Sequence, residues 1–145
     1  LVIKENLDLS LRSGDVRLET VTVAGETSVQ LSSGELGLRN VVSKDLFLEV
    51  TSGDIQLEGV LVANQTTLEA TSGDIGLSQF KAGQETEISV TSGNIKGDLV
   101  GKITEYTIQS SVTSGDNNLP QELDGGYKQL RVEATSGDIN IQFDH

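Results

Sequence analysis

The chain has 145 residues and a formal net charge of −12, from 22 acidic and 10 basic residues, which fits a single domain with an acidic surface. It has no cysteine and only one histidine, His145, which excludes disulfide frameworks, cysteine-ligated zinc sites and nearly all histidine-based triads. The acidic balance argues against nucleic acid as a partner, and without a long apolar run we expect no direct membrane insertion by this segment.

A Ser-Gly dipeptide recurs seven times along the chain, at intervals of 19 to 22 residues between glycines. Four copies extend to Thr-Ser-Gly-Asp-Ile or its Asn variant, at residues 51–55, 71–75, 91–95 and 135–139. Repeats at this spacing indicate a stacked architecture. The repeated pairs are Ser13 and Gly14, Ser33 and Gly34, Ser52 and Gly53, Ser72 and Gly73, Ser92 and Gly93, Ser114 and Gly115, and Ser136 and Gly137.

Four positions in each repeat are apolar, namely five and three residues before the glycine and two and four residues after it. Of the 28 residues at these positions, 25 are apolar, whereas the residues between them are mostly polar. Strict alternation is typical of strands with one buried face. Each repeat is therefore predicted to contain a strand on either side of its Ser-Gly pair.

The spacing between apolar positions predicts two bends in each repeat. Five residues separate the apolar positions on either side of the glycine, so the chain must turn there to keep both on the buried face, and glycine permits the backbone angle of such a turn. A second odd step leads to an apolar position seven residues after the glycine and predicts another bend, then a short third strand through Val23 and Val62. That apolar position holds Val21, Val41, Val60, Phe80 and Val100.

These elements predict an all-β fold, a right-handed parallel β-solenoid (β-helix) of about seven coils of about 20 residues each. No single repeat can bury its apolar face alone, but stacked repeats can. We expect residues 1–145 to form one solenoid domain that is a fragment of a longer chain. A β-sandwich is the alternative, because short strands with regular turns suit it also.

The repeat is irregular from residue 97 to 128. Gly97, Ser110 and Asn117 interrupt the apolar positions, and Pro120 lies within a longer connection. Since proline cannot donate to a central strand pair, residues 116–127 are expected to bulge outward. This segment is either a tolerated insertion or a binding loop carried by the scaffold.

An acidic or amide residue follows each glycine, which allows two interpretations. In a solenoid these side chains form a row, and carboxylates in a row suit calcium, with Asp54, Asp74, Asp116 and Asp138 as candidate ligands. Alternatively, each side chain caps its own corner by accepting a backbone N–H. We favour capping and expect no cofactor. The row is Asp15, Glu35, Asp54, Asp74, Asn94, Asp116 and Asp138.

No catalytic residue is predicted. The corner serines have no histidine base available to them and no nucleophile-elbow sequence around them, so we interpret the Ser-Gly pairs as structural corners. Carboxylates are abundant along the whole chain, and their presence therefore does not identify an acid–base pair. The sequence favours a protein that is not an enzyme.

The Thr-Ser-Gly-Asp-Ile units at about 20-residue spacing resemble a bacterial family of β-strand-repeat domains of unknown function that carries the label adhesin. The similarity covers essentially the whole chain, with departures at Arg12, Ser32, Glu35 and Asn94 and in the irregular sixth repeat. The resemblance implies a β-solenoid in the cell envelope or outside the cell, often within a longer, membrane-anchored chain. It supplies no catalytic residues.

Three functions stay open from the sequence. The first is a non-enzymatic scaffold or adhesion module that presents a polar, acidic face to a surface protein or a glycan. The second is end-to-end self-association through unpaired edge strands at residues 1–3 and 141–143. The third, which we favour least, is a calcium-dependent protein that binds or processes carbohydrate.

Overall fold

The computed structural model describes residues 2–143; Leu1 of the predicted N-terminal edge and His145 lie outside the described residues. Within 2–143 the chain is almost entirely β-structure, with one short 3-10 helix, η1 (Ile103–Glu105). The strands are β1 (Val2–Ile3), β2 (Leu7–Ser13), β3 (Val16–Ser33), β4 (Leu36–Ser52), β5 (Ile55–Glu58), β6 (Leu61–Val62), β7 (Gln65–Ser72), β8 (Ile75–Phe80), β9 (Glu85–Ser92), β10 (Ile95–Leu99), β11 (Tyr106–Ser114), β12 (Glu122–Leu123), β13 (Lys128–Ser136) and β14 (Ile139–Phe143).

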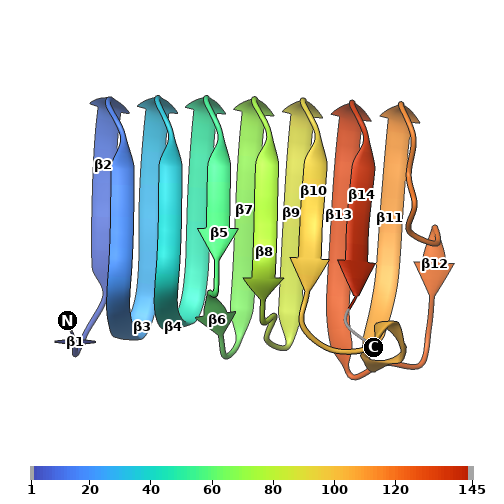
Figure 1. The fold of residues 1–145 in the computed structure, drawn as a ribbon, viewed down its shortest axis with the longest axis horizontal. Helices are drawn as coiled ribbons and strands as arrows, with labels where there is room; N and C mark the ends of the chain where they lie inside the picture. The colour runs from blue at the N-terminus through green and yellow to red at the C-terminus, as the bar shows by residue number, and fades with distance from the viewer. Residues whose placement is uncertain (1, 144–145) are drawn as a thin grey trace.

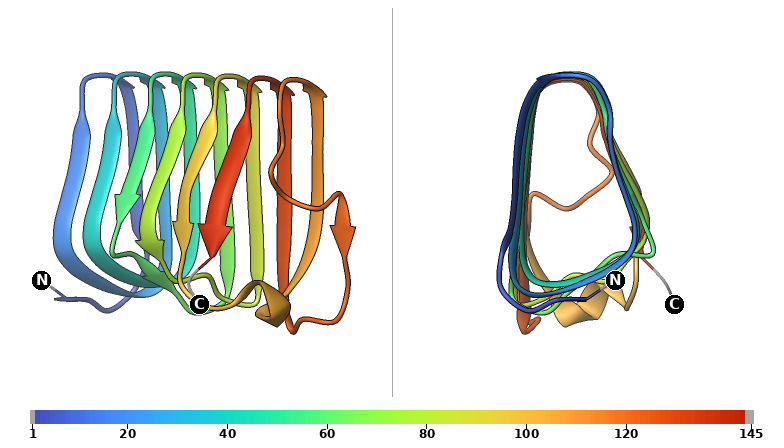
Figure 2. Two further views of the ribbon diagram at one scale, coloured as in Figure 1. Left: turned by 45° about the vertical axis from the view of Figure 1, so that its right-hand side comes forward. Right: turned by 90° about the vertical axis from the view of Figure 1, so that its left-hand side faces the viewer.

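The strands wind into a solenoid, as the sequence predicts (Figure 1). Seen from the N-terminal end, the chain rises along one side, crosses the narrow top and descends along the other side while receding from the viewer, which makes the winding right-handed (Figure 2). Among the described residues all strand pairs of the coils are parallel, and only β12 pairs antiparallel. The predicted right-handed parallel β-solenoid of about seven coils is confirmed, and the β-sandwich is wrong.

Each coil has two long faces and a base. The strands before each Ser-Gly corner form the rising face, made by β2, residues 27–33 of β3, residues 46–52 of β4, β7, β9, β13 and β11. The strands after the corner form the descending face, made by residues 16–19, residues 36–39, β5, β8, β10 and β14. The base contains residues 21–23, residues 41–43 and β6.

The apolar positions predicted from the repeat fill the interior between these faces. Val29, Leu48, Leu68 and Ile88 are fully buried on the rising face, and their counterparts on the descending face are buried as well. Because the strands are parallel and in register, like side chains stack on like side chains. The interior is therefore one continuous apolar core.

The corner glycines stack in a file at the top of the solenoid. Gly53, Gly73 and Gly93 have φ of 141°, 145° and 146°, in the region that favours glycine. A Cβ on any of these three would overlap the carbonyl oxygen of the preceding glycine in the stack. Glycine is thus required twice over, for its backbone angle and for the close approach of consecutive coils.

The second predicted bend is present and has its own backbone signature. Thr20, Asn40 and Gln79 have φ of 52°, 54° and 50°, and Gly59 at the equivalent position has φ of 61°. Four coils therefore turn into the base through one residue in the left-handed region, and only one of the four uses glycine. The turn keeps the residue that follows it, such as Val21 or Val60, on the buried face.

Val100 does not occupy the buried position that the repeat predicts for the fifth coil. The register of β10 against β8 shifts between Gly97 and Leu99, so Leu99 instead of Val100 lies beside Phe80. Leu99 is 1% exposed, whereas Val100 is only partly buried. The prediction for this position is wrong by one residue, because the bulge was not visible in the alternation.

The last two coils do not stack in chain order. The rising strand β13 of the seventh coil pairs with β9 of the fifth coil on one side and with β11 of the sixth coil on the other. On the descending face, β14 pairs with β10. The seventh coil is therefore inserted between the fifth and the sixth (Figure 1), and the expectation that all coils stack successively is wrong at this end.

Residues 116–127 fold across the end of the solenoid instead of bulging outward (Figure 2). β12 pairs antiparallel with the outer edge of β11. The inward side chain of Ser110 donates to Pro120 O at 2.7 Å, and its backbone N–H donates to Gln121 O. Leu119, which belongs to the segment, is buried against the apolar core. The connection is an end cap, and the outward bulge is a wrong prediction.

Candidate functional site

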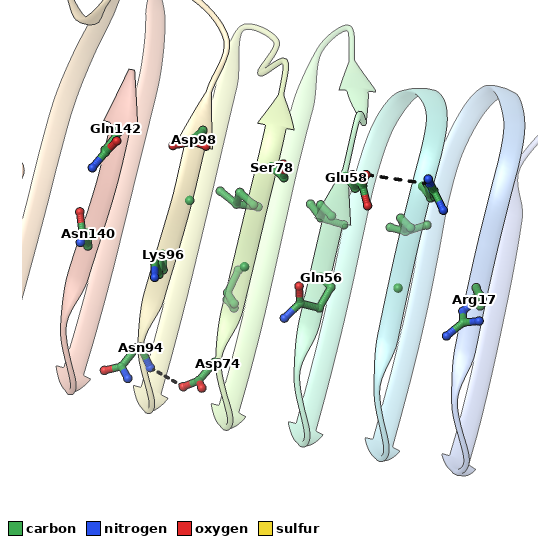
Figure 3. Close-up of a pocket in the computed structure, with 18 of the residues that line it drawn as sticks. Arg17, Gln56, Glu58, Asp74, Ser78, Asn94, Lys96, Asp98, Asn140 and Gln142 are labelled. Atoms are coloured by element: carbon green, nitrogen blue, oxygen red, sulfur yellow. Dashed lines mark hydrogen bonds and ion pairs between the residues drawn. The ribbon is translucent and has the colours of Figure 1, made fainter. Parts of the chain in front are cut away.

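An open groove of about 980 Å³ lies on the descending face. It runs across the strands, along the solenoid axis, over residues 16–19 and 36–39, β5, β8, β10 and β14 (Figure 3). Its floor is the outer side of the sheet, where polar side chains of successive coils lie in two rows. The rows are Arg17, Gly37, Gln56, Gly76, Lys96 and Asn140, and then Glu19, Arg39, Glu58, Ser78, Asp98 and Gln142.

In the first row, glycines occur at every second coil and leave space at the floor of the groove. Gly37 lies between Arg17 and Gln56, and a Cβ there would meet only Val16 O, at 3.9 Å. At Gly76 a Cβ would meet the Gln56 amide at 3.1 to 3.3 Å, so the Gln56 side chain leans over this glycine. From the first to the fifth coil the row thus alternates a long polar side chain with a glycine, with about 9.5 Å between long side chains two coils apart, and Lys96 and Asn140 are then direct neighbours.

The groove offers donors as well as acceptors. Three of the ten basic residues, Arg17, Arg39 and Lys96, line it together with amide side chains. One weak ion pair joins Arg39 Nε to Glu58 Oε1 at 4.0 Å, with both side chains more than half exposed, and such exposed pairs contribute little to stability. Breaking this ion pair therefore loses little free energy, and the side chains of Arg39 and Glu58 can bind a ligand instead.

The rising face differs from the groove in charge. Glu49 and Glu69 lie side by side in the register of β4 and β7, and Glu85 and Glu87 follow on β9. Arg131, beside Glu87, is the basic side chain among them. The rising strands thus carry more acidic than basic side chains, while the groove mixes both signs of charge with neutral amides.

The acidic row at the corner forms a hydrogen-bonded file along the stack. Asp54 Oδ1 accepts the backbone N–H of Asp74 at 2.9 Å, and Asp74 Oδ1 accepts the N–H of Asn94 at 2.8 Å. The file then follows the inserted coil, because Asn94 Oδ1 accepts from Asp138 and Asp138 Oδ1 accepts from Asp116. Asp15, Asp54, Asp74, Asn94 and Asp138 thus each cap the next coil in space, so the expectation that each side chain caps its own corner is wrong.

The candidate calcium ligands are members of this file. Asp54, Asp74 and Asp138 each use one carboxylate oxygen to hold a neighbouring backbone N–H, and Asp116 ends the file. Among residues 2–143 no three acidic or histidine side chains lie close enough together to hold a metal ion. The row is spread along the solenoid, one carboxylate per coil.

The corner serines contribute their main chain to the same file. The carbonyl oxygen of each of Ser33, Ser52, Ser72, Ser92, Ser136 and Ser114 accepts the glycine N–H of the preceding coil in the stack, at 2.9 to 3.1 Å. The Ser-Gly pairs are thus the points where the coils are tied to each other at the top of the solenoid.

A cluster that the sequence did not predict joins the two exchanged coils. Lys128 Nζ lies 5.5 Å from the ring centre of Tyr106, 5.6 Å from that of Tyr127, and 3.8 Å from Glu105 Oε1. The Tyr106 ring is 5.0 Å from that of Phe143, and its hydroxyl donates to Val100 O. Finding this cluster from sequence would require knowing the register of the irregular segment from residue 97 to 128, which contains Glu105, Tyr106 and Tyr127.

The pKa shifts of the described residues fall in this cluster. Burial raises the pKa of Tyr106 to about 12. The backbone N–H of Lys102 and the hydroxyl of Tyr127 both donate to Glu105 and lower the pKa of its carboxyl group, and the same bond raises the pKa of Tyr127. All three shifts favour the protonation states that these groups already have at neutral pH. The cluster therefore works as a clasp, which we define as Glu105, Tyr106, Tyr127, Lys128 and Phe143.

The corner file, the stacked core and the polar groove together define a parallel β-solenoid repeat domain. The chain belongs to the Toastrack DUF4097 family of domains of unknown function, whose family model matches residues 2–142. No curated protein and no solved structure matches the chain. None of the helices in residues 2–143 is both long enough and apolar enough to cross a membrane.

Proposed function

We propose that this domain is a non-enzymatic scaffold that binds an extended polar chain, a glycan or a strand of a surface protein, in the groove of the descending face. The groove carries the proposal, because it is a long hollow in which donors and acceptors recur at the spacing of the coils. A rigid stack of parallel strands holds these side chains at fixed intervals without help from the ligand.

The chemistry of the groove supports a polar ligand. Arg17, Gln56, Lys96 and Asn140 present guanidinium, amide and ammonium donors along one row, and their counterparts in a ligand are carbonyl, hydroxyl or carboxylate oxygens. The glycine notch at Gly37 lets the ligand approach the backbone of the sheet. The family resemblance supports a location in the cell envelope or outside the cell.

The test fills one notch and measures binding. The domain is immobilised and exposed in parallel to a panel of bacterial envelope glycans and to a panel of extended peptides from surface proteins, with binding followed by interferometry. Gly37→Tyr places a ring between Arg17 and Gln56 at a position with room for a Cβ. We expect saturable binding to one panel by the unaltered domain, weakened at least about tenfold by Gly37→Tyr.

Ser89→Tyr is the matched control, because Ser89 points outward from the middle of the rising face, away from the groove. It should bind as the unaltered domain does. Equal binding by Gly37→Tyr, or no binding to either panel, would contradict the proposal. Turnover of a bound glycan would contradict its non-enzymatic part.

A further inference from the structure

The two ends of the solenoid are built differently. β2 is the first strand of the rising face, and within residues 2–143 it pairs only with β3. Leu11 is 43% exposed and Leu9 is partly exposed, whereas Leu31 and Val29, their counterparts in the second coil, are 2% and 0% exposed. The N-terminal end thus presents an unpaired strand edge together with the open side of the apolar core.

The opposite end is closed. Ile108 of β11 is fully buried, because β12, Leu119 and Leu123 cover it. On the descending face the side chain of Asn118 binds both backbone groups of Ile141, accepting its N–H and donating to its carbonyl at 2.9 Å each. The strand at residues 141–143, expected to be a free edge, is therefore covered at Ile141 by the side chain of Asn118.

The sequence of the open edge is complementary to itself. We propose that a second copy of this chain docks on the N-terminal end, with the two β2 strands antiparallel and Ser10 next to Ser10 of the second copy. In this register Leu9 faces Leu11 of the other copy on the core side, so the apolar ladder continues across the interface. On the outer side Asp8 faces Arg12, an opposite-charge pair that the twofold symmetry makes twice.

The first strand of the descending face supports the same symmetry axis. Ser10 and Leu18 lie four residues before and four residues after Gly14, so both are at the same height below the corner. An axis through this height that relates the two β2 strands also brings Arg17 of one copy toward Glu19 of the other. Two different faces are thus complementary in charge about one axis, and this coincidence favours this register.

The charge of this end permits association. Residues 1–19 contain Lys4, Arg12 and Arg17 against four acidic residues, whereas the whole chain has 10 basic and 22 acidic residues. The N-terminal coil is thus nearly neutral, and two such ends meet with little of the repulsion that two acidic rising faces would suffer. Since the other end is capped, association stops at two copies and forms no filament.

The test uses exposed residues that do not contribute to the core. Asp8 and Arg12 both point outward from β2. In Asp8→Arg two arginines face each other at both symmetric contacts, and in Arg12→Asp two acids do. We expect sedimentation velocity to show a concentration-dependent dimer for the unaltered chain, tagged only at its C-terminus, and a dissociation constant raised about tenfold or more in each single variant.

Two further samples make the test specific. The double variant Asp8→Arg/Arg12→Asp restores opposite charges and should dimerise as the unaltered chain does, and an equimolar mixture of the two single variants should form a mixed dimer. Glu87→Arg, an exposed change on β9 far from the open end, should leave the dimer intact. A monomer at all concentrations, assemblies larger than two copies, or a dimer unaffected by the single variants would overturn the proposal.

Discussion

At the scale of single residues, the corner glycines show why the repeat is so regular. A polar residue on the outside of a strand can vary, as the first row of the groove does from Arg17 to Gly37 to Gln56. A corner glycine cannot vary in the same way, because the preceding coil occupies the space where its Cβ would be. The motif is thus a packing requirement, which explains why it predicts the fold well and the function poorly.

Replacing an inner corner glycine should cost much more stability than replacing the outermost one. Gly73→Ala forces the added carbon onto Gly53 O, whereas at Gly14 no atom lies within 4 Å and only the φ of 110° opposes the change. We expect a loss in the free energy of unfolding of about 4 kcal/mol for Gly73→Ala and about 1–2 kcal/mol for Gly14→Ala. Urea denaturation followed by circular dichroism measures both, and equal losses would contradict the stacked corner.

At the scale of elements, alternation in the sequence predicted the strands on both sides of each corner, and its odd steps predicted both bends. The second bend shows that the spacing of apolar residues can locate a turn even where no glycine marks it. This spacing located the turn before Val21 and Val41, although neither Thr20 nor Asn40 is a glycine. The bulge in β10 escaped prediction because it depends on how Gly97 packs against Leu77, not on the order of apolar residues.

The end cap is the element most dependent on polar residues in apolar positions. Ser110 holds the cap through Pro120 O and through the amide of Asn117, which donates to Ser110 Oγ at 2.9 Å. Ser110→Val restores the usual apolar residue of the repeat but removes both bonds. We expect the segment 116–127 to become sensitive to limited proteolysis, with the rest of the solenoid intact, as shown by mass spectrometry of the fragments.

Ser111→Val provides the control for this change. Ser111 is the next residue of β11, points outward and has no bond to the cap. It should leave the cleavage pattern unchanged. If Ser110→Val is cleaved no faster than Ser111→Val, the cap is held by Leu119 and β12 alone.

At the scale of the whole molecule, the sequence predicted the solenoid but not the order of its coils. All regular coils carry the same apolar positions, so the edge of any one fits the edge of any other. The only available sign was composition: the sixth repeat has Ser110 and Asn117 where others have apolar residues, while the seventh keeps the regular motif at residues 135–139. End coils of repeat proteins are atypical, and on this ground the sixth repeat is the end coil.

The candidate site was predictable only in part. The residues of the groove stood out as a polar column between apolar ones, but its hollow form depends on which glycines lie next to which long side chains. The clasp was not predicted, because Glu105, Tyr106 and Tyr127 lie in the irregular segment from residue 97 to 128, where the repeat gives no register.

The absence of cysteine from the chain allows the coil order to be measured directly. Ser136 lies in register between Ser92 and Ser114, and all three are exposed at the corner. Neighbouring coils are about 4.8 Å apart, within the Cα separation of a disulfide, whereas coils two apart are beyond it. We therefore expect Ser92→Cys/Ser136→Cys to form an intramolecular disulfide under mild oxidation and Ser92→Cys/Ser114→Cys to stay reduced, as read by peptide mapping.

The pair Ser114→Cys/Ser136→Cys is the positive control, because these two coils are neighbours whether or not the stack follows the chain. In a stack that followed the chain, Ser92 would be bridged to position 114 and not to position 136. The two test pairs thus exchange their outcomes between the two arrangements, and a bridge at 92–114 would rule out the inserted coil. A bridge at 92–136 would establish that the capped end belongs to the sixth coil, which leaves the N-terminal edge as the open one.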